Sequence, residues 1–199
     1  MTIRSLFHTP VYEGDLGDAV LIEALLGMAH TLAHDDRAGA RWSREHRYKG
    51  YTSYASLNDL PLRDPDAAAL VKKLDRHVAA FAKACAFDLP KRLKCDSLWV
   101  NILKPGGMHS SHIHPHSVVS GTLYLDVPEG AGGLRFEDPR LPLMMAAPMR
   151  CGDAPEALRP HVTITPRPGM ILLWESWLRH EVEAHGGKSE RVSISFNYS

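Results

Sequence analysis

The feature that most constrains the fold is a series of short β-branched or aromatic segments in the second half of the chain. Gly, Pro and Asp residues, which favour turns, separate them at the spacing typical of a β-sandwich or β-barrel. The segments are SLWVNIL, SVVSGTLYLDV, GLRFED, HVTITP, GMILLW and RVSISFNYS. The sequence from about Leu98 onward therefore predicts a β-rich core.

The first half of the chain is predicted to support this core with two helices. Residues 18–34 carry apolar side chains at helical spacing. A second helix begins at Asp64, because its side chain can cap the helix and the following proline suits the first helical position, and it ends before Pro90. The charged, aperiodic residues 36–50 predict a surface loop, and residues 51–57 predict a strand.

No linker or repeat divides the 199 residues, so we expect a single domain over residues 1–199. Residues 1–95 supply the helical and strand support, and residues 96–199 form the core. The expected fold class is mainly β with flanking helices, an α+β arrangement in which two N-terminal helices buttress one sheet.

Composition excludes several classes of protein. The 23 Lys and Arg residues balance 23 Asp and Glu residues, so neither a nucleic-acid partner nor an anionic membrane partner is expected. No apolar run is long enough to span a membrane, and the N-terminus lacks the apolar stretch of a signal peptide. Three widely spaced cysteines without a CxxC pair fit a reducing compartment. We expect a cytoplasmic protein.

Histidines are concentrated in the segment HSSHIHPHS, where four of the 12 fall between His109 and His116. In an extended chain, side chains two positions apart share a face, so His112 and His114 can present two imidazoles to one metal ion. His180 follows the predicted strand MILLW, 66 positions after His114, and a barrel can bring it to the same ion. The alternative is a polar loop with unrelated imidazoles.

The final predicted strand, RVSISFN, begins with a cation. Arg191, Ser193 and Ser195 share one face of this strand, whereas Val192, Ile194 and Phe196 share the other. If the first face lies inside the barrel, the buried guanidinium requires an anion, and a carboxylate suits its paired donors. The alternative is a surface arginine paired with Glu190.

Together these motifs resemble a bacterial and phage family of oxygenases that depend on Fe(II) and 2-oxoglutarate. The resemblance rests on WVNILKPGGMHSSHIHPHSVVSGTLYLDVPEGAGGLRFEDPR, PRPGMILLWESWLRHEVEAH and the closing SERVSISFNYS, and spans about residues 98–199. It implies a double-stranded β-helix core, a jelly roll related to cupins. It also implies a dioxygenase that uses Fe(II), 2-oxoglutarate and O2 to hydroxylate an unknown substrate, with no catalytic residue beyond the metal ligands.

Carried over by residue, the resemblance makes His112 and His180 iron ligands and Arg191 the partner of the distal carboxylate of 2-oxoglutarate. Ser193 would share that carboxylate, and Tyr124 in GTLYL would offer a hydroxyl unless it is a plain core aromatic. Trp99, Trp174 and Trp177 flank the expected site in the sequence, where they would shield it or stack on a substrate; the alternative is that they are plain core aromatics.

The sequence departs from the general oxygenase class at one ligand. That class has His-x-Asp or His-x-Glu, but here His114 stands where the carboxylate would be, so the expected metal ligands are His112, His114 and His180. Other residues could complete the triad instead. These are Asp126, Glu137, Asp138 and, if Pro115 kinks the chain, His116.

Two other functions stay open at this point. One is a cupin-type three-histidine metal enzyme that does not use 2-oxoglutarate, and the other is a non-catalytic, metal-stabilised binding domain. The substrate, a small molecule or a peptide, is not identified by these motifs, and a homodimer is one option for the assembly. The segment 140–160 is expected to be a mobile lid or an insertion.

Overall fold

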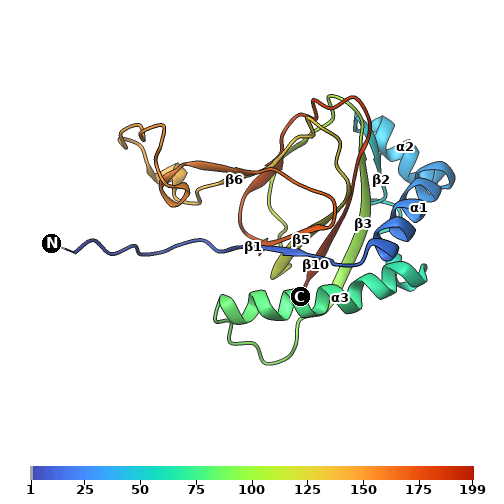
Figure 1. The fold of residues 1–199 in the computed structure, drawn as a ribbon, viewed down its shortest axis with the longest axis horizontal. Helices are drawn as coiled ribbons and strands as arrows, with labels where there is room; N and C mark the ends of the chain where they lie inside the picture. The colour runs from blue at the N-terminus through green and yellow to red at the C-terminus, as the bar shows by residue number, and fades with distance from the viewer. Residues whose placement is uncertain (1) are drawn as a thin grey trace.

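The computed structural model of the chain describes residues 2–199. Two antiparallel sheets form its core and three helices cover one side of it (Figure 1). The helices are α1 (Ala19–Asp35), α2 (Arg37–Glu45) and α3 (Pro65–Ala84). The strands are β1 (Val11–Asp15), β2 (Gly50–Thr52), β3 (Cys95–Leu103), β4 (His109–His112), β5 (Val119–Asp126), β6 (Leu134–Glu137), β7 (His161–Ile164), β8 (Met170–Glu175), β9 (His180–Val182) and β10 (Arg191–Tyr198).

The larger sheet has the order β1-β8-β5-β10-β3-β2 and the smaller one β4-β9-β6-β7. Strands distant in sequence are therefore neighbours, as in a jelly roll, and the predicted β-rich fold with helical support is confirmed. Among residues 2–199, no helix has both the length and the apolar character needed to cross a membrane.

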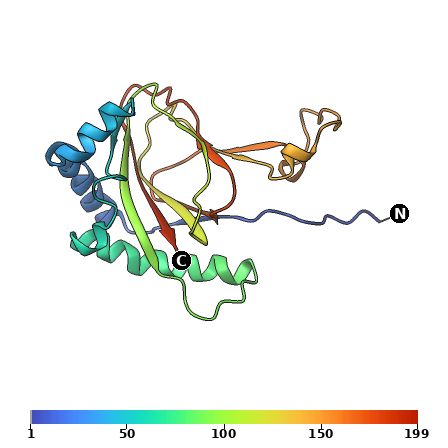
Figure 2. The same cartoon turned by 180° about the vertical axis from the view of Figure 1, so that it is seen from behind.

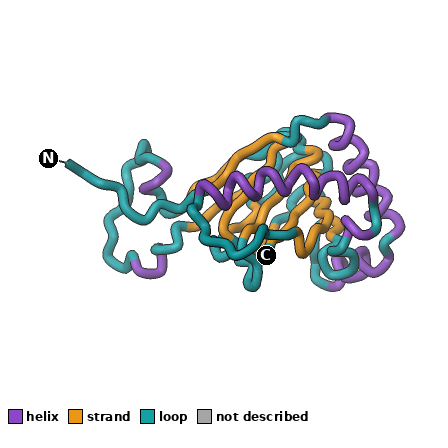
Figure 3. The backbone as a smooth tube through the Cα atoms, turned by 90° about the horizontal axis from the view of Figure 1, so that it is seen from below, coloured by secondary structure: helices purple, strands orange, loops and turns teal. Residues whose placement is uncertain are grey.

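Alternation along the strands divides the buried residues between two layers. One face of the larger sheet packs against α1 and α3, and α3 runs across the strands (Figure 3). Val192, Ile194 and Phe196 belong to this layer, whereas the opposite face of the sheet contributes Tyr124 and Trp174 to the layer between the sheets. The predicted division of β10 into two faces is confirmed.

The prediction of a surface loop over residues 36–50, between α1 and β2, is wrong. Residues 37–45 form α2, so three helices support the core instead of two. Asp36 accepts a hydrogen bond from the Gly39 amide at the start of α2, and the hydroxyls of Tyr51 and Ser56 donate to the same carboxylate. Tyr51 and Ser56 follow α2 in the sequence, so the periodicity of the helical residues themselves did not predict the helix.

The strand expected at residues 51–57 is also shorter than predicted, because β2 ends at Thr52.

The segment 140–160 contains two short 3-10 helices, η2 (Leu141–Leu143) and η3 (Glu156–Leu158). This segment and the N-terminal residues extend away from the helices on the opposite side of the core (Figure 2). Its role as a lid stays a prediction.

Candidate metal centre

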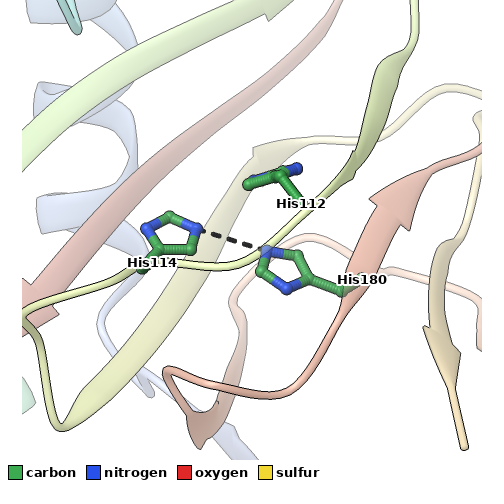
Figure 4. Close-up of side chains that lie close together, drawn as sticks. All are labelled: His112, His114 and His180. Atoms are coloured by element: carbon green, nitrogen blue, oxygen red, sulfur yellow. Dashed lines mark hydrogen bonds between the residues drawn. The ribbon is translucent and has the colours of Figure 1, made fainter. Parts of the chain in front are cut away.

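Three imidazoles converge between the two sheets. One nitrogen from each of His112, His114 and His180 lies within 4.8 Å of the others, and this is the group of potential metal ligands found among residues 2–199 (Figure 4). The Nε2 atoms of His114 and His180 are 3.3 Å apart. Two nitrogens bound at right angles to one ion, each about 2.1 Å from it, would lie about 3 Å apart, so the spacing fits a common metal ion.

Strand pairing brings two of these histidines together. His112 ends β4 and His180 begins β9, and the two residues are direct partners in the antiparallel ladder. His114 lies two residues beyond the end of β4, where its amide donates a hydrogen bond to the Ser176 carbonyl. The expectation that His112 and His114 share one strand is therefore wrong, although both side chains reach the same point.

Backbone carbonyls set the orientation of two imidazoles. Nδ1 of His112 lies 2.7 Å from the Ser110 carbonyl, and Nδ1 of His180 lies 2.9 Å from the Leu178 carbonyl. Only a protonated Nδ1 can donate to a carbonyl, so in each neutral ring Nε2 keeps its lone pair. These lone pairs are available to a cation, as a metal ligand requires.

A polar network holds the segment that anchors His114. The Ser120 hydroxyl contacts the Ser176 hydroxyl and also donates to Asn197 Oδ1, each at 2.8 Å. All three residues are buried, so these bonds fix the Ser176 backbone, whose carbonyl accepts from His114. The Trp99 ring stacks near His114 with a centroid distance of 6.0 Å.

Burial keeps the imidazoles of His114 and His180 neutral. It lowers the pKa of His180 to about 3 and that of His114 to about 4, in both cases with a further contribution from the neighbouring His112. His109 lines the same cavity, and burial together with the Arg191 charge lowers its pKa to about 3. Neutral imidazoles bind metal ions, whereas protonated ones do not.

We expect the metal-free protein to lose stability as the pH falls from about 6.5 toward 4. The unfolded chain takes up protons on these histidines in that range, whereas the folded chain does not, so acid favours unfolding. Urea unfolding midpoints at several pH values would measure the effect. His109→Gln should flatten the profile, and His34→Gln, at an exposed position, should not. A midpoint independent of pH over this range would contradict the expectation.

The second expected part of the site is an anion-binding group. Arg191 is only 2% exposed, and its Nε has no hydrogen-bond partner. Glu190 forms no ion pair with it, and neither does any other acidic residue among residues 2–199. The alternative of a surface arginine is therefore wrong, and the buried cation lacks a counter-ion from the chain itself.

Tyr124 and Ser193 accompany Arg191. The Arg191 guanidinium carbon lies 4.9 Å from the centre of the Tyr124 ring, and the Tyr124 hydroxyl is buried without a partner. Burial raises the pKa of Tyr124, although the nearby Arg191 opposes this, so the phenol keeps its proton and can donate. Ser193 is the ladder partner of Tyr124, and all three residues line one cavity with the histidines.

The other residues considered for the triad lie elsewhere. His116 is exposed, with a φ of 78°, and Asp126 is exposed at the end of β5. Glu137 faces His161 and Arg179, and Asp138 pairs with Arg140. None of them belongs to the cluster of potential ligands. The geometry therefore favours His114 as the third member.

Two contributors to the site were not predicted. His109 lines the cavity, and its Nε2 lies 2.6 Å from the Tyr48 hydroxyl. Nothing in the local sequence connects these residues, which are 61 positions apart.

Of the three tryptophans, Trp99 and Trp174 line the cavity as expected, whereas Trp177 is 48% exposed and its indole donates to Glu175.

The space between these side chains is small. The cavity holds about 50 Å³, room for one or two water molecules, so a larger ligand can enter only if lining side chains move. A groove of about 540 Å³ lies between β1, β7 and the segment that follows β6. Phe136 belongs to its wall, and the Phe136 ring centre is 5.4 Å from that of Trp174 and 6.2 Å from that of His180. One aromatic layer thus separates groove and cavity.

A family model described as "Putative 2OG-Fe(II) oxygenase" matches residues 97–197, just over half of the chain. This range contains the three histidines as well as Tyr124, Arg191 and Ser193. No curated protein matches the sequence.

Several solved structures share the fold at low sequence identity. A Pseudomonas putida prolyl-4-hydroxylase is 16% identical, with 96% of this chain and 92% of that chain covered and a TM-score of 0.64. The epimerase SnoN, in complex with Fe3+ and alpha ketoglutarate, is 18% identical over 96% and 79% of the two chains, with a TM-score of 0.66. HygX from Streptomyces hygroscopicus, with nickel and 2-oxoglutarate bound, is 14% identical over 96% and 82%, with a TM-score of 0.61.

Proposed function

The chain belongs to the family of 2OG-Fe(II) oxygenases, and from this premise we propose that His112, His114 and His180 hold Fe(II) while Arg191, Ser193 and Tyr124 hold 2-oxoglutarate. The observation that supports this assignment is the joint presence, in one cavity, of three converging imidazoles and a buried arginine whose Nε has no hydrogen-bond partner. Family membership makes the protein an oxidoreductase with Fe(II) and 2-oxoglutarate as cofactors. It favours this activity over a cupin-type enzyme without 2-oxoglutarate and over a non-catalytic domain.

The residues of the cavity fit both groups. Imidazoles whose Nε2 keeps its lone pair, as in His112 and His180, suit a divalent transition metal, and Arg191 Nε with the Tyr124 hydroxyl provides two unused donors for a carboxylate. When bound, Fe(II) and 2-oxoglutarate together supply the activation of O2 and the oxidising power of the reaction. The chain positions them: Arg191 binds the distal carboxylate, Ser193 and Tyr124 donate to it, and Trp99 and Trp174 exclude water.

For the substrate, we propose the groove between β1 and β7. It is larger than the cavity and is lined in part by Phe136 and Leu178, and the Leu178 carbonyl accepts the hydrogen bond that orients His180. A volume of about 540 Å³ is within the usual range for small-molecule sites. A cytoplasmic location, the absence of a nucleic-acid partner and a homodimeric assembly stay proposals from the sequence.

The test is an anaerobic titration of the metal-free protein with Fe(II) and then 2-oxoglutarate. We expect a weak visible charge-transfer band, because a keto acid that chelates the ion in this cavity is held beside three imidazoles. Glutarate, which lacks the keto oxygen, is the matched control and should give no band. Stoichiometric iron binding without any band on addition of 2-oxoglutarate would contradict the proposal and favour a cupin-type site.

A further inference from the structure

Buried donors without partners are concentrated around one cavity, the cavity at the metal centre. Four buried side-chain atoms among residues 2–199 lack a hydrogen-bond partner: Tyr124 Oη, Arg135 Nε, Trp174 Nε1 and Arg191 Nε. All except Arg135 belong to residues that line this cavity. A buried donor left unpaired lowers stability, so each one requires an explanation. The proposed binding of 2-oxoglutarate gives Tyr124 and Arg191 a partner but leaves Trp174 without one.

The Trp174 indole is packed from several sides. It is 3% exposed and lies on β8 between β1 and β5, where Val11 and Ser120 are its ladder partners. Its ring centre is 4.6 Å from that of His180 and 5.4 Å from that of Phe136, and the ring planes are inclined by 61° and 70°. Edge-to-face contacts of this kind hold an aromatic ring in place. The indole N–H therefore does not reach bulk solvent for a partner.

The neighbouring side chains offer no acceptor to this N–H. Val11 and Phe136 are apolar, and the Ser120 hydroxyl already takes part in two hydrogen bonds. Nδ1 of His180 is bonded to a backbone carbonyl, which leaves only the Nε2 lone pair that a metal ion would occupy. An indole N–H is a donor only and carries no charge. The partner that Trp174 lacks is therefore an oxygen atom with a free lone pair, supplied from outside the chain.

The position of Trp174 indicates which ligand supplies that oxygen. Trp174 lines the cavity at the metal centre and not the groove proposed for the substrate, whose wall contains Phe136 instead. The cavity holds about 50 Å³, room for one or two water molecules, so a single water fits without rearrangement and a keto acid enters as lining side chains move. The acceptor thus belongs to a ligand of the metal centre and not to the substrate.

We propose that the Trp174 indole is a further ligand-binding group of the metal centre, which donates a hydrogen bond to an oxygen atom of 2-oxoglutarate or of a water molecule held there. Both sources share one chemistry, an uncharged N–H donor and an oxygen acceptor. The first source rests on the proposed function, whereas the second requires only a metal ion at the three histidines. Trp174 then joins Arg191 and Tyr124 as a third donor, and it keeps its proton at every pH.

The experiment follows the indole N–H signals by NMR in the full chain labelled with ¹⁵N-tryptophan. The chain has four tryptophans, and replacing each in turn by phenylalanine assigns the four signals. The metal-free protein is titrated with Zn(II), which is redox-inert and binds the same imidazole ligands as Fe(II), and then with 2-oxoglutarate. We expect the Trp174 proton signal to move downfield and its exchange with solvent to slow at least tenfold, as for a newly formed hydrogen bond. The Trp177 indole, which already donates to Glu175, should give an unchanged signal.

The step at which the signal moves identifies the source of the oxygen. A shift on addition of Zn(II) alone supports a water molecule, whereas a shift that requires 2-oxoglutarate supports an oxygen of the keto acid. In the second case Trp174→Phe should also bind 2-oxoglutarate roughly 10-fold or more weakly, the effect of one hydrogen bond to a charged group. Trp177→Phe, which removes an exposed indole, is the matched control and should bind it as the unaltered protein does.

Two results overturn the inference. One is a Trp174 signal that stays in place through both additions although the visible band of the iron-loaded protein shows that 2-oxoglutarate binds. The other is a Trp177 signal that moves as far as that of Trp174, because the response would then be a general change of the fold. Absence of the band overturns the proposed function instead, and the response to Zn(II) alone still decides whether Trp174 binds a water molecule at the metal centre.

Discussion

His114→Ala is expected to lower the affinity for Fe(II) by at least about 100-fold. Loss of a residue that only hydrogen-bonds to a metal ligand typically lowers metal affinity by about 10- to 100-fold, and loss of a ligand should have a larger effect. His114 Nε2 lies 3.3 Å from that of His180, so its loss leaves only two members of the cluster of potential ligands found among residues 2–199. Iron content after anaerobic loading and desalting would measure the effect, and circular dichroism would verify that the fold persists.

The matched control for this prediction is His116→Asn. His116 belongs to the same histidine-rich segment but is exposed, and asparagine tolerates its φ of 78°. The control should bind iron as the unaltered protein does. If His116→Asn lost iron while His114→Ala kept it, the ligand assignment would be wrong and the chain around Pro115 would have to rearrange in the presence of metal.

The second large effect is expected for Arg191→Met. This change should weaken the binding of 2-oxoglutarate by about 2–5 kcal/mol, or roughly 30-fold to a few thousand-fold, as is typical when one partner of a buried charge pair is truncated. Iron content should be unchanged, because Arg191 is not among the potential metal ligands. Titration of the iron-loaded protein with 2-oxoglutarate, followed by the visible band, would measure the dissociation constant.

Stability separates this role from a structural one. The Arg191 guanidinium is buried without a counter-ion, so its replacement by an apolar side chain of similar length should not lower the free energy of unfolding of the ligand-free protein. Arg167→Met, which removes an exposed partner of Asp15, is the control and should leave 2-oxoglutarate binding intact. Loss of both stability and iron in Arg191→Met would indicate that the arginine organises the fold.

The sequence was most informative where a local period repeats. Alternation along RVSISFN placed Arg191 and Ser193 on one face and Ile194 on the other, and the structure divides these residues in that way between the two layers. The same rule was only partly right for the histidines, since His114 lies outside β4 and is held by the Ser176 carbonyl. Alternation of side chains between two faces holds within a strand, but it does not predict the residue at which the strand ends.

Non-local partners account for what the sequence analysis missed. The capping carboxylate of α2 is supported by Tyr51 and Ser56, which follow the helix in sequence. His109 is positioned by Tyr48, although the two are 61 residues apart. Neither interaction leaves a periodic trace, because it depends on how separate segments meet after the chain has folded.

The sequence by itself determined the fold class, the histidines available for a metal site and the arginine available for an anion, because residue type and strand alternation are local properties. Only the tertiary structure decided that His114 joins His112 and His180 while Asp126, Glu137 and Asp138 stay apart. It also decided that the cavity contains no acidic residue. The physical reason is that the charge and ligand set of a site depend on which strands become neighbours, and here β4 and β9 pair although their partners His112 and His180 are 68 positions apart in the sequence.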